Sequence, residues 1–98
     1  MKNKLQQCHQ KDTPNNKLNC IQFSYAIEDT SEIADLICNG TQHNLTKYNA
    51  GVQPTLIIYS MLGEYVALFE NNWIIQYDNT NFDIISDEDF NSQFTLIK

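Results

Sequence analysis

The chain has 98 residues, enough for one small domain with a single core. Its twelve Asp and Glu residues outnumber six Lys, and it lacks Arg, the residue that makes bidentate contacts to phosphates and bases, so we expect no direct nucleic-acid binding. No segment approaches the roughly 20 apolar residues that span a bilayer and the N-terminus lacks the apolar core of a signal peptide, so we expect a cytoplasmic protein without a membrane partner.

Charge is divided unevenly along the chain. Residues 1–20 hold four Lys against Asp12, a balance of +3, whereas residues 21–98 hold eleven acids against Lys47 and Lys98, a balance of −9. One interpretation is an ordinary solvated surface, as in many soluble proteins. The other is that the acids imitate a polyanion or engage a basic partner protein.

The N-terminal segment, residues 1–16, is polar, lacks apolar periodicity and ends in Pro14-Asn15-Asn16. This composition predicts a flexible arm ahead of a single domain over residues 17–98. The stretch 18–25 then reads as the first strand, and its expected core face comprises Ile21, Phe23 and Tyr25.

A short helix is predicted after this strand. Asp29 or Thr30 is placed to cap it, and Gly40 lies just past its end. Its apolar stripe consists of Ile33, Leu36 and Ile37. Residues 41–54 carry scattered apolar side chains among Asn, Gly and Pro, which predicts a crossing loop with at most a short strand near Leu45.

Three strands with tight turns between them are predicted over residues 55–60, 64–69 and 73–77. The first two are rich in apolar residues, so we expect both to be buried and the second to be a central strand covered on both faces. Asn71 and Asn72 suit the turn before the third strand, because Asn tolerates positive φ at little cost. Trp73 opens the third strand, where we expect it in the core and not on a ligand-stacking surface.

The last part of the sequence predicts an extended piece over residues 82–85 and a closing helix over residues 87–94. Ser86 is a candidate N-cap, and three acids follow it where the helix dipole favours negative charge. Phe90 and Phe94 are four residues apart, which places both rings on the helix face toward the sheet. The elements together predict an α+β fold: a small antiparallel sheet of four or five strands with two short helices, and with Trp73 and Phe90 buried.

From Lys17 onward, about four fifths of the chain resembles a group of small uncharacterised bacteriophage and prophage proteins. The likeness is carried by six segments: Cys20-Ile21-Gln22-Phe23, Ser31-Glu32-Ile33, Leu62-Gly63-Glu64-Tyr65-Val66, Asn72-Trp73-Ile74-Ile75, Phe82-Asp83-Ile84, and Asp87 to Phe94. The pattern of the group has Gly-Asp where this chain has Asn71-Asn72, and basic residues common in its early strand are missing here. The resemblance implies phage ancestry and a small α+β fold, and it assigns no functional residue.

Residue types that carry metal binding or catalysis are sparse. Cys8, Cys20 and Cys38 follow no zinc-finger or zinc-ribbon spacing, and only two His residues could complete a site. We expect Cys20 and Cys38 to be buried as small hydrophobes and Cys8 to be a free thiol on the arm. The three Gly residues are isolated and form no phosphate-binding loop. The sequence therefore predicts no metal, no cofactor and no catalytic residue, and we expect a protein that is not an enzyme.

These features favour a phage-encoded interaction protein of the anti-CRISPR or other anti-defence type. We expect it to inhibit a host protein, such as a nucleic-acid-binding defence complex, by steric or acidic-surface blocking. The alternatives are a virion structural or assembly accessory and a small-ligand-binding or enzymatic module. The candidate partner contacts are acids near strand ends, turns and the last helix start: Glu64, Glu70, Asp78, Asp83, Asp87 and Glu88. If charge does not mediate binding, the apolar candidates are Tyr59, Tyr65 and Tyr77.

Overall fold

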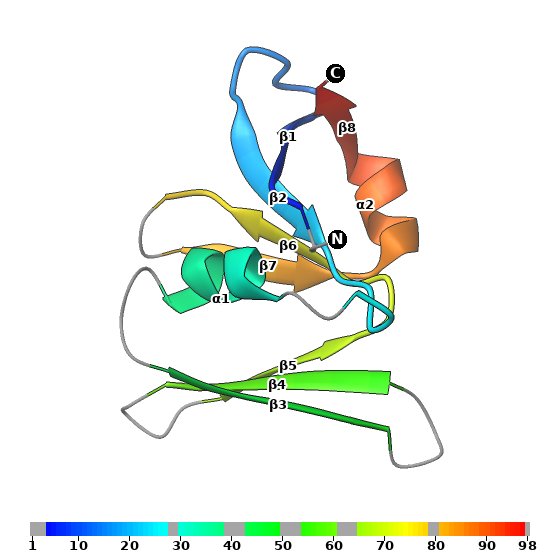
Figure 1. The fold of residues 1–98 in the computed structure, drawn as a ribbon. Coiled ribbons are helices and arrows are strands. Elements are labelled where there is room, and N and C mark those ends of the chain that lie inside the picture. Colours follow the sequence, from blue (N-terminus) through cyan, green and yellow to red (C-terminus); the bar gives the residue numbers. More distant parts are fainter. Residues whose placement is uncertain are drawn as a thin grey trace.

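Two antiparallel sheets and two short helices build the fold (Figure 1). The computed structural model describes residues 4–27, 30–38, 43–49, 54–60, 65–78 and 81–97. Within these residues the chain forms eight strands and two helices, so the predicted α+β class is confirmed. The strands, however, are divided between two sheets, where the sequence predicted one.

The larger sheet has five strands in the order β7-β6-β2-β1-β8. These strands are β1 Gln6–Gln10, β2 Leu18–Gln22, β6 Trp73–Gln76, β7 Phe82–Ile85 and β8 Phe94–Ile97. Every neighbouring pair is antiparallel. Strands from the beginning and the end of the described chain therefore lie side by side, since β1 is next to β8.

The smaller sheet contains β3 His43–Asn49, β4 Pro54–Ser60 and β5 Tyr65–Phe69, in that order. It lies below the larger sheet in Figure 1. Strand β3 occupies much of the segment predicted as a crossing loop, because pairing with β4 along its whole length supplies hydrogen bonds that local propensity does not signal. Strand β5 is an outer strand and not the predicted central one, and its Phe69 is 40% exposed.

The turn between β5 and β6 connects the smaller sheet to the larger one. Asn71 adopts a φ of 68°, which confirms the turn predicted there. The Phe23 N–H donates to the Asn72 carbonyl oxygen at 2.8 Å, and the Asn71 N–H donates to the Phe23 carbonyl oxygen at 3.0 Å. These bonds hold the turn against the end of β2. The strand predicted over residues 18–25 ends at Gln22. After the turn, the chain passes from β5 of the smaller sheet to β6 of the larger sheet.

Both predicted helices form, α1 over Ser31–Cys38 and α2 over Asp87–Gln93. The Ala34 N–H donates to the Thr30 carbonyl oxygen at 3.1 Å, which places Thr30 at the N-cap position of α1. Ser86 caps α2 as predicted, because its Oγ accepts from the Asp89 N–H at 3.1 Å. Helix α2 ends before Phe94, which is extended and begins β8 opposite Gln10.

Hydrophobic side chains cover both faces of the larger sheet. The cluster that joins it to α1 and the smaller sheet, here the inner cluster, contains Ile21, Phe23, Ile33, Leu36, Leu56, Ile58, Leu68 and Ile74. The cluster on the face that carries α2, here the α2 cluster, contains Cys8, Leu18, Cys20, Trp73, Ile75, Phe90 and Phe94. Consecutive residues of β6 alternate between the clusters, because successive side chains of a strand point to opposite faces.

Three aromatic rings form a stack in the α2 cluster. Trp73 is 4% exposed, and its ring lies parallel to that of Phe90 with 3.8 Å between the ring centroids. Phe90 in turn stacks on Phe94 with a centroid distance of 5.5 Å. The predicted burial of Trp73 and Phe90 is confirmed. Phe90 and Phe94 both pack in the α2 cluster on the sheet, but the prediction that both lie on the helix is wrong, because Phe94 begins β8.

Strand β1 replaces part of the predicted flexible arm. It pairs with β2 on one side and with β8 on the other, and its Cys8 is completely buried. The prediction of a flexible arm is therefore wrong for residues 6–10. Cys8 is a free cysteine, as predicted, but it is buried in the sheet and does not lie on an arm. The segment QQCHQ has a single small hydrophobe and no apolar alternation, so its neighbours and not its own pattern make it a strand. Cys20 is buried as predicted, whereas the Cys38 side chain lies outside the described part.

Candidate functional site

The acids predicted as partner contacts have different roles in the structure. Glu64 lies outside the described residues. Glu70 and Asp87 are half-buried, whereas Asp78, Asp83 and Glu88 are exposed. Their hydrogen bonds show which of them serve the fold and which are presented to solvent.

Glu70 stabilises the chain that follows β2. Both of its carboxylate oxygens accept from the Tyr25 N–H, at 3.3 and 3.2 Å. Tyr25 packs against the inner cluster, so this contact ties the end of β5 to the segment beyond β2. A half-buried carboxylate that satisfies a backbone donor has a structural role, and Glu70 is therefore a poor candidate for partner contact.

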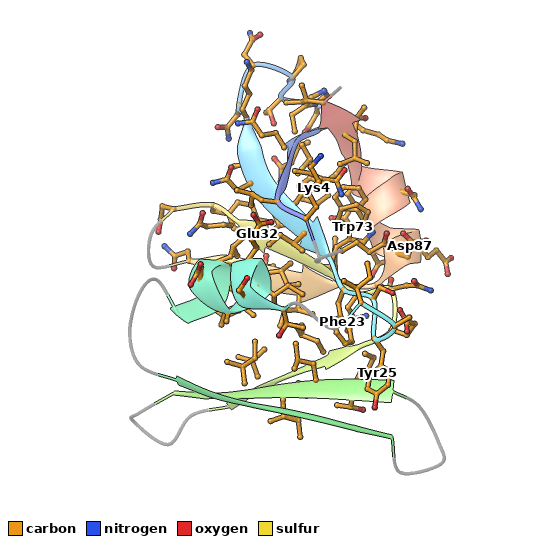
Figure 2. The ribbon with its side chains drawn as sticks, in the orientation of Figure 1. Lys4, Phe23, Tyr25, Glu32, Trp73 and Asp87 are labelled. Atoms are coloured by element: carbon orange, nitrogen blue, oxygen red, sulfur yellow. The ribbon has the colours of Figure 1, made fainter. Side chains whose placement is uncertain are left out.

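Asp87 joins α2 to the larger sheet. Its Oδ1 accepts from the Trp73 Nε1–H at 2.8 Å and from the Gln22 Nε2–H at 3.2 Å. Figure 2 shows Trp73 and Asp87 together beside the start of α2. As the first residue of α2, Asp87 also lies at the positive end of the helix dipole. Its carboxylate is therefore engaged within the fold.

Four exposed carboxylates run from the β6–β7 turn along β7 to the first turn of α2. We call them the acidic rim: Asp78, Asp83, Glu88 and Asp89. Asp83 pairs with Ile75, a member of the α2 cluster, so Asp83 lies on the α2 side of the sheet. Glu88 and Asp89 follow in the first turn of α2, the helix that packs on this same side of the sheet. The sequence indicated Asp89 only as a helix-start acid, and its exposure adds it to the candidate surface.

The acidic rim is held on ordered backbone. The Asp78 carboxylate accepts from the Asn81 N–H at 3.0 Å and from the Asn81 Nδ2–H at 2.9 Å, and so ties the chain after β6 to the residue before β7. Strand β7 is paired with β6, and α2 is capped by Ser86. The carboxylates therefore project from backbone positions that are already ordered before any partner binds.

Tyr77 lies beside the acidic rim. It is 39% exposed, and its hydroxyl donates to the Asp83 carboxylate. Burial, and then this hydrogen bond, raise the pKa of Tyr77 above its ordinary value of 10.0. Of the three Tyr residues predicted as apolar contacts, Tyr77 is the one whose side chain is described. The side chains of Tyr59 and Tyr65 lie outside the described part.

Basic residues flank the β1–β2 hairpin. Lys4 precedes β1, Lys11 follows it and Lys17 precedes β2, and all three are exposed. Lys17 leads into β2, which pairs directly with β6, so it lies about one strand step from the end of β6 that leads to Asp78. For Lys4 and Lys11, which flank β1, strand β7 is three strand steps away, a distance of about 14 Å at about 4.8 Å per step. This exceeds the screening length of about 8 Å at physiological salt. Residues 48–97 contain seven acids and neither Lys nor Arg, so nothing in that stretch neutralises the acidic rim.

Other chemistry is limited in the described part of the chain. No group of three or more His, Cys, Asp or Glu residues there could hold a metal ion. The thiols of Cys8 and Cys20 do meet in the α2 cluster. Their spacing in the sequence gave no sign of this, because the pairing of β1 with β2 was not predicted. None of the described helices is both long and apolar enough to span a membrane.

Comparison of the chain with protein-family models, with curated proteins and with solved structures found no match.

Proposed function

We propose that this chain is a non-enzymatic inhibitor of phage or prophage origin, which binds a basic surface of a host protein through the acidic rim. The partner class is a host protein that otherwise holds nucleic acid, as in a bacterial defence complex, and the anti-CRISPR proteins are one example of such inhibitors. The partner is blocked by occupancy and without turnover. The site of action is the cytoplasm of the bacterial host.

The observation that carries the proposal is the acidic rim itself. Its four exposed carboxylates lie along one edge strand and one helix start, in a stretch without Lys or Arg. A surface that binds phosphates presents positive charge, and carboxylates on ordered backbone complement that charge. Because the supporting strand and helix are already formed, little conformational entropy is lost when the acidic rim binds.

Acids on an edge strand have a second use, since charge there prevents pairing between the edges of two molecules. The experiment must separate this protective role from binding. We therefore compare two charge-reversed variants of equal net charge. Asp83→Lys/Glu88→Lys reverses the acidic rim, and Asp12→Lys/Asp35→Lys reverses two exposed acids on the β1–β2 turn and on α1.

The tagged chain and both variants are used for affinity capture from a bacterial host lysate, and association with the captured protein is then measured at several salt concentrations. We expect the rim variant to lose binding and the control variant to retain it. The on-rate of the unmodified chain should fall as salt rises toward physiological strength, because exposed charges are screened beyond about 8 to 10 Å.

Thermal melts provide the folding control. Asp83→Lys removes the acceptor of the Tyr77 hydroxyl and should cost about 0.5 to 1.5 kcal/mol. Glu88→Lys should cost about 0.3 to 1 kcal/mol because it opposes the helix dipole. Loss of binding by a rim variant that still folds would therefore show that the acidic rim contacts the partner. Association that is insensitive both to salt and to rim reversal would overturn the charge mechanism, and Tyr77 would become the next residue to test.

A further inference from the structure

Two buried thiols meet where the first two strands pair. Cys8 of β1 and Cys20 of β2 are both fully buried and are free cysteines. Both belong to the α2 cluster, which also contains Trp73 and Phe90. Neither thiol belongs to the acidic rim, because β1 and β2 are inner strands of the larger sheet and the rim lies along its edge strand β7 and the start of α2.

The strand register explains why the thiols are neighbours. Cys8 is paired with Leu18, and Cys20 is paired with Gln6. Residues two apart on a strand point to the same face, so Cys8 and Cys20 both face α2 and are diagonal neighbours on adjacent strands. Their side chains are joined by a hydrogen bond.

We propose that Cys8 and Cys20 form a reversible disulfide between β1 and β2, made by hydrogen peroxide and broken by small thiols. The link would convert a non-covalent hairpin into a closed loop over residues 8–20. It would act as a redox-sensitive lock on β1, the strand between β2 and β8.

The reaction balances in two steps. The Cys8 thiolate attacks one oxygen of peroxide, and the O–O bond breaks to leave a sulfenic acid and, after protonation, water. The Cys20 sulfur then attacks the Cys8 sulfur, an S–S bond forms, and the hydroxyl leaves as a second water after taking up the Cys20 proton. Two thiols are oxidised and one peroxide is reduced, and a small thiol reverses the change by disulfide exchange.

The environments of the two thiols suit these roles. The hydrogen bond from Cys20 lowers the pKa of Cys8, although burial opposes this effect. The same hydrogen bond, together with burial and repulsion from a Cys8 thiolate, raises the pKa of Cys20. While β1 and β2 are paired, Cys8 therefore has more thiolate character than Cys20.

Burial and strand geometry determine how fast the disulfide forms. Because neither thiol is exposed, peroxide reaches Cys8 only when β1 opens locally. Diagonal partners are farther apart than directly opposed residues because they are offset along the strands, so bond formation must shift β1 locally along β2. A strained link is more easily reduced, which is consistent with reversal by small thiols.

The test uses the full chain with graded hydrogen peroxide, in native buffer and in urea just below the unfolding transition. The readouts are intact mass and a non-reducing peptide map with trypsin and a glutamate-specific protease. Cleavage after Lys17 and Glu28 separates the Cys20 peptide from Cys38.

We expect the oxidised chain to lose the mass of two hydrogens and to give a linked Cys8–Cys20 peptide. The link should form faster in urea and should be fully reversed by dithiothreitol. The melting temperature of the linked chain should rise by about 5 °C.

Variants Cys8→Ala and Cys20→Ala should each abolish the link, and Cys38→Ala should leave it unchanged. If one of these variants does not fold, the peptide map of the unmodified chain still decides the question. A link through Cys38, a disulfide-joined dimer, sulfinic acid at Cys8 without a link, or unreacted thiols in both buffers would each overturn the proposal.

Discussion

Trp73 has two kinds of contact that both hold α2 on the sheet. Its ring face stacks on Phe90, and its indole N–H donates to Asp87 at the helix start. The apolar and polar parts of one side chain therefore fix the helix at two points. Because the whole stack is buried, removal of the ring leaves a cavity that the short helix cannot fill by a small shift.

We expect Trp73→Ala to cost about 3 to 5 kcal/mol of unfolding free energy, the usual loss for a large aromatic in a core. A denaturant titration measures this loss. The matched control is Phe69→Ala, since Phe69 is a large ring that is 40% exposed, and it should cost far less. A loss below about 1 kcal/mol for Trp73→Ala would contradict the packing described here.

Asp87 was a predicted partner contact, and the structure uses it as an internal acceptor. Replacement by Ala leaves the indole N–H of Trp73 without its carboxylate partner and removes a charge from the helix start. We expect Asp87→Ala to cost about 1.5 to 3 kcal/mol, as for hydrogen bonds to charged groups. Glu88→Ala, one residue further on and exposed, should cost only about 0.3 to 1 kcal/mol.

A double-mutant cycle identifies the source of that difference. Trp73→Phe keeps an aromatic ring and removes the N–H donor, so the Asp87→Ala penalty should shrink in the Trp73→Phe background. An undiminished penalty would mean that Asp87 acts through the helix dipole or through Gln22, and not through the indole.

At the level of elements, β1 is where structure and sequence differ most. If residues 1–16 formed the flexible arm that their composition predicts, a chain that begins at Asn15 would still fold. The structure reverses this expectation, since the deletion removes β1 from between two strands and takes Cys8 from the core. We expect the truncated chain to lose cooperative unfolding in circular dichroism melts.

A single-residue comparison tests the same strand without deletion. Cys8→Asp places a charge in the α2 cluster, whereas Gln7→Asp places it on an exposed neighbour. The first should strongly destabilise the chain and the second should change stability by about 0.5 kcal/mol at most. Equal effects would indicate that β1 is not packed as described.

Elements with local signals were predictable from sequence. Ser86 and the acids after it marked the start of α2, and the stripe of Ile33, Leu36 and Ile37 marked α1. Asn71 marked the turn before β6. Strands β1 and β8 were missed, and β3 was predicted only as a possible short strand near Leu45, because what makes all three of them strands is a partner elsewhere in the chain. Phe94 continued the helical spacing of Phe90, yet pairing with Gln10 makes it the first residue of β8.

At the level of the whole molecule, the candidate site was predictable only as a set of charges. Charge counting identified an excess of acids, and Asp78, Asp83 and Glu88 are indeed exposed. It could not show that Glu70 and Asp87 are used internally, since that depends on Tyr25 and Trp73 approaching them in space. Nor could it show that Asp83 on β7 and the Lys residues that flank β1 are separated by two strands of one sheet.

The pairing of β1 with β8 also constrains how the molecule folds. Cys8 is paired with Leu96, so the ends of a very long loop must come together before the larger sheet is complete. Topologies dominated by such distant pairings fold slowly compared with helical bundles. On the ribosome, β1 emerges first of the eight strands and β8 last, so one edge of β1 stays open throughout synthesis. During that interval the nascent chain presents an unpaired strand edge, the feature through which growing chains most readily associate with one another.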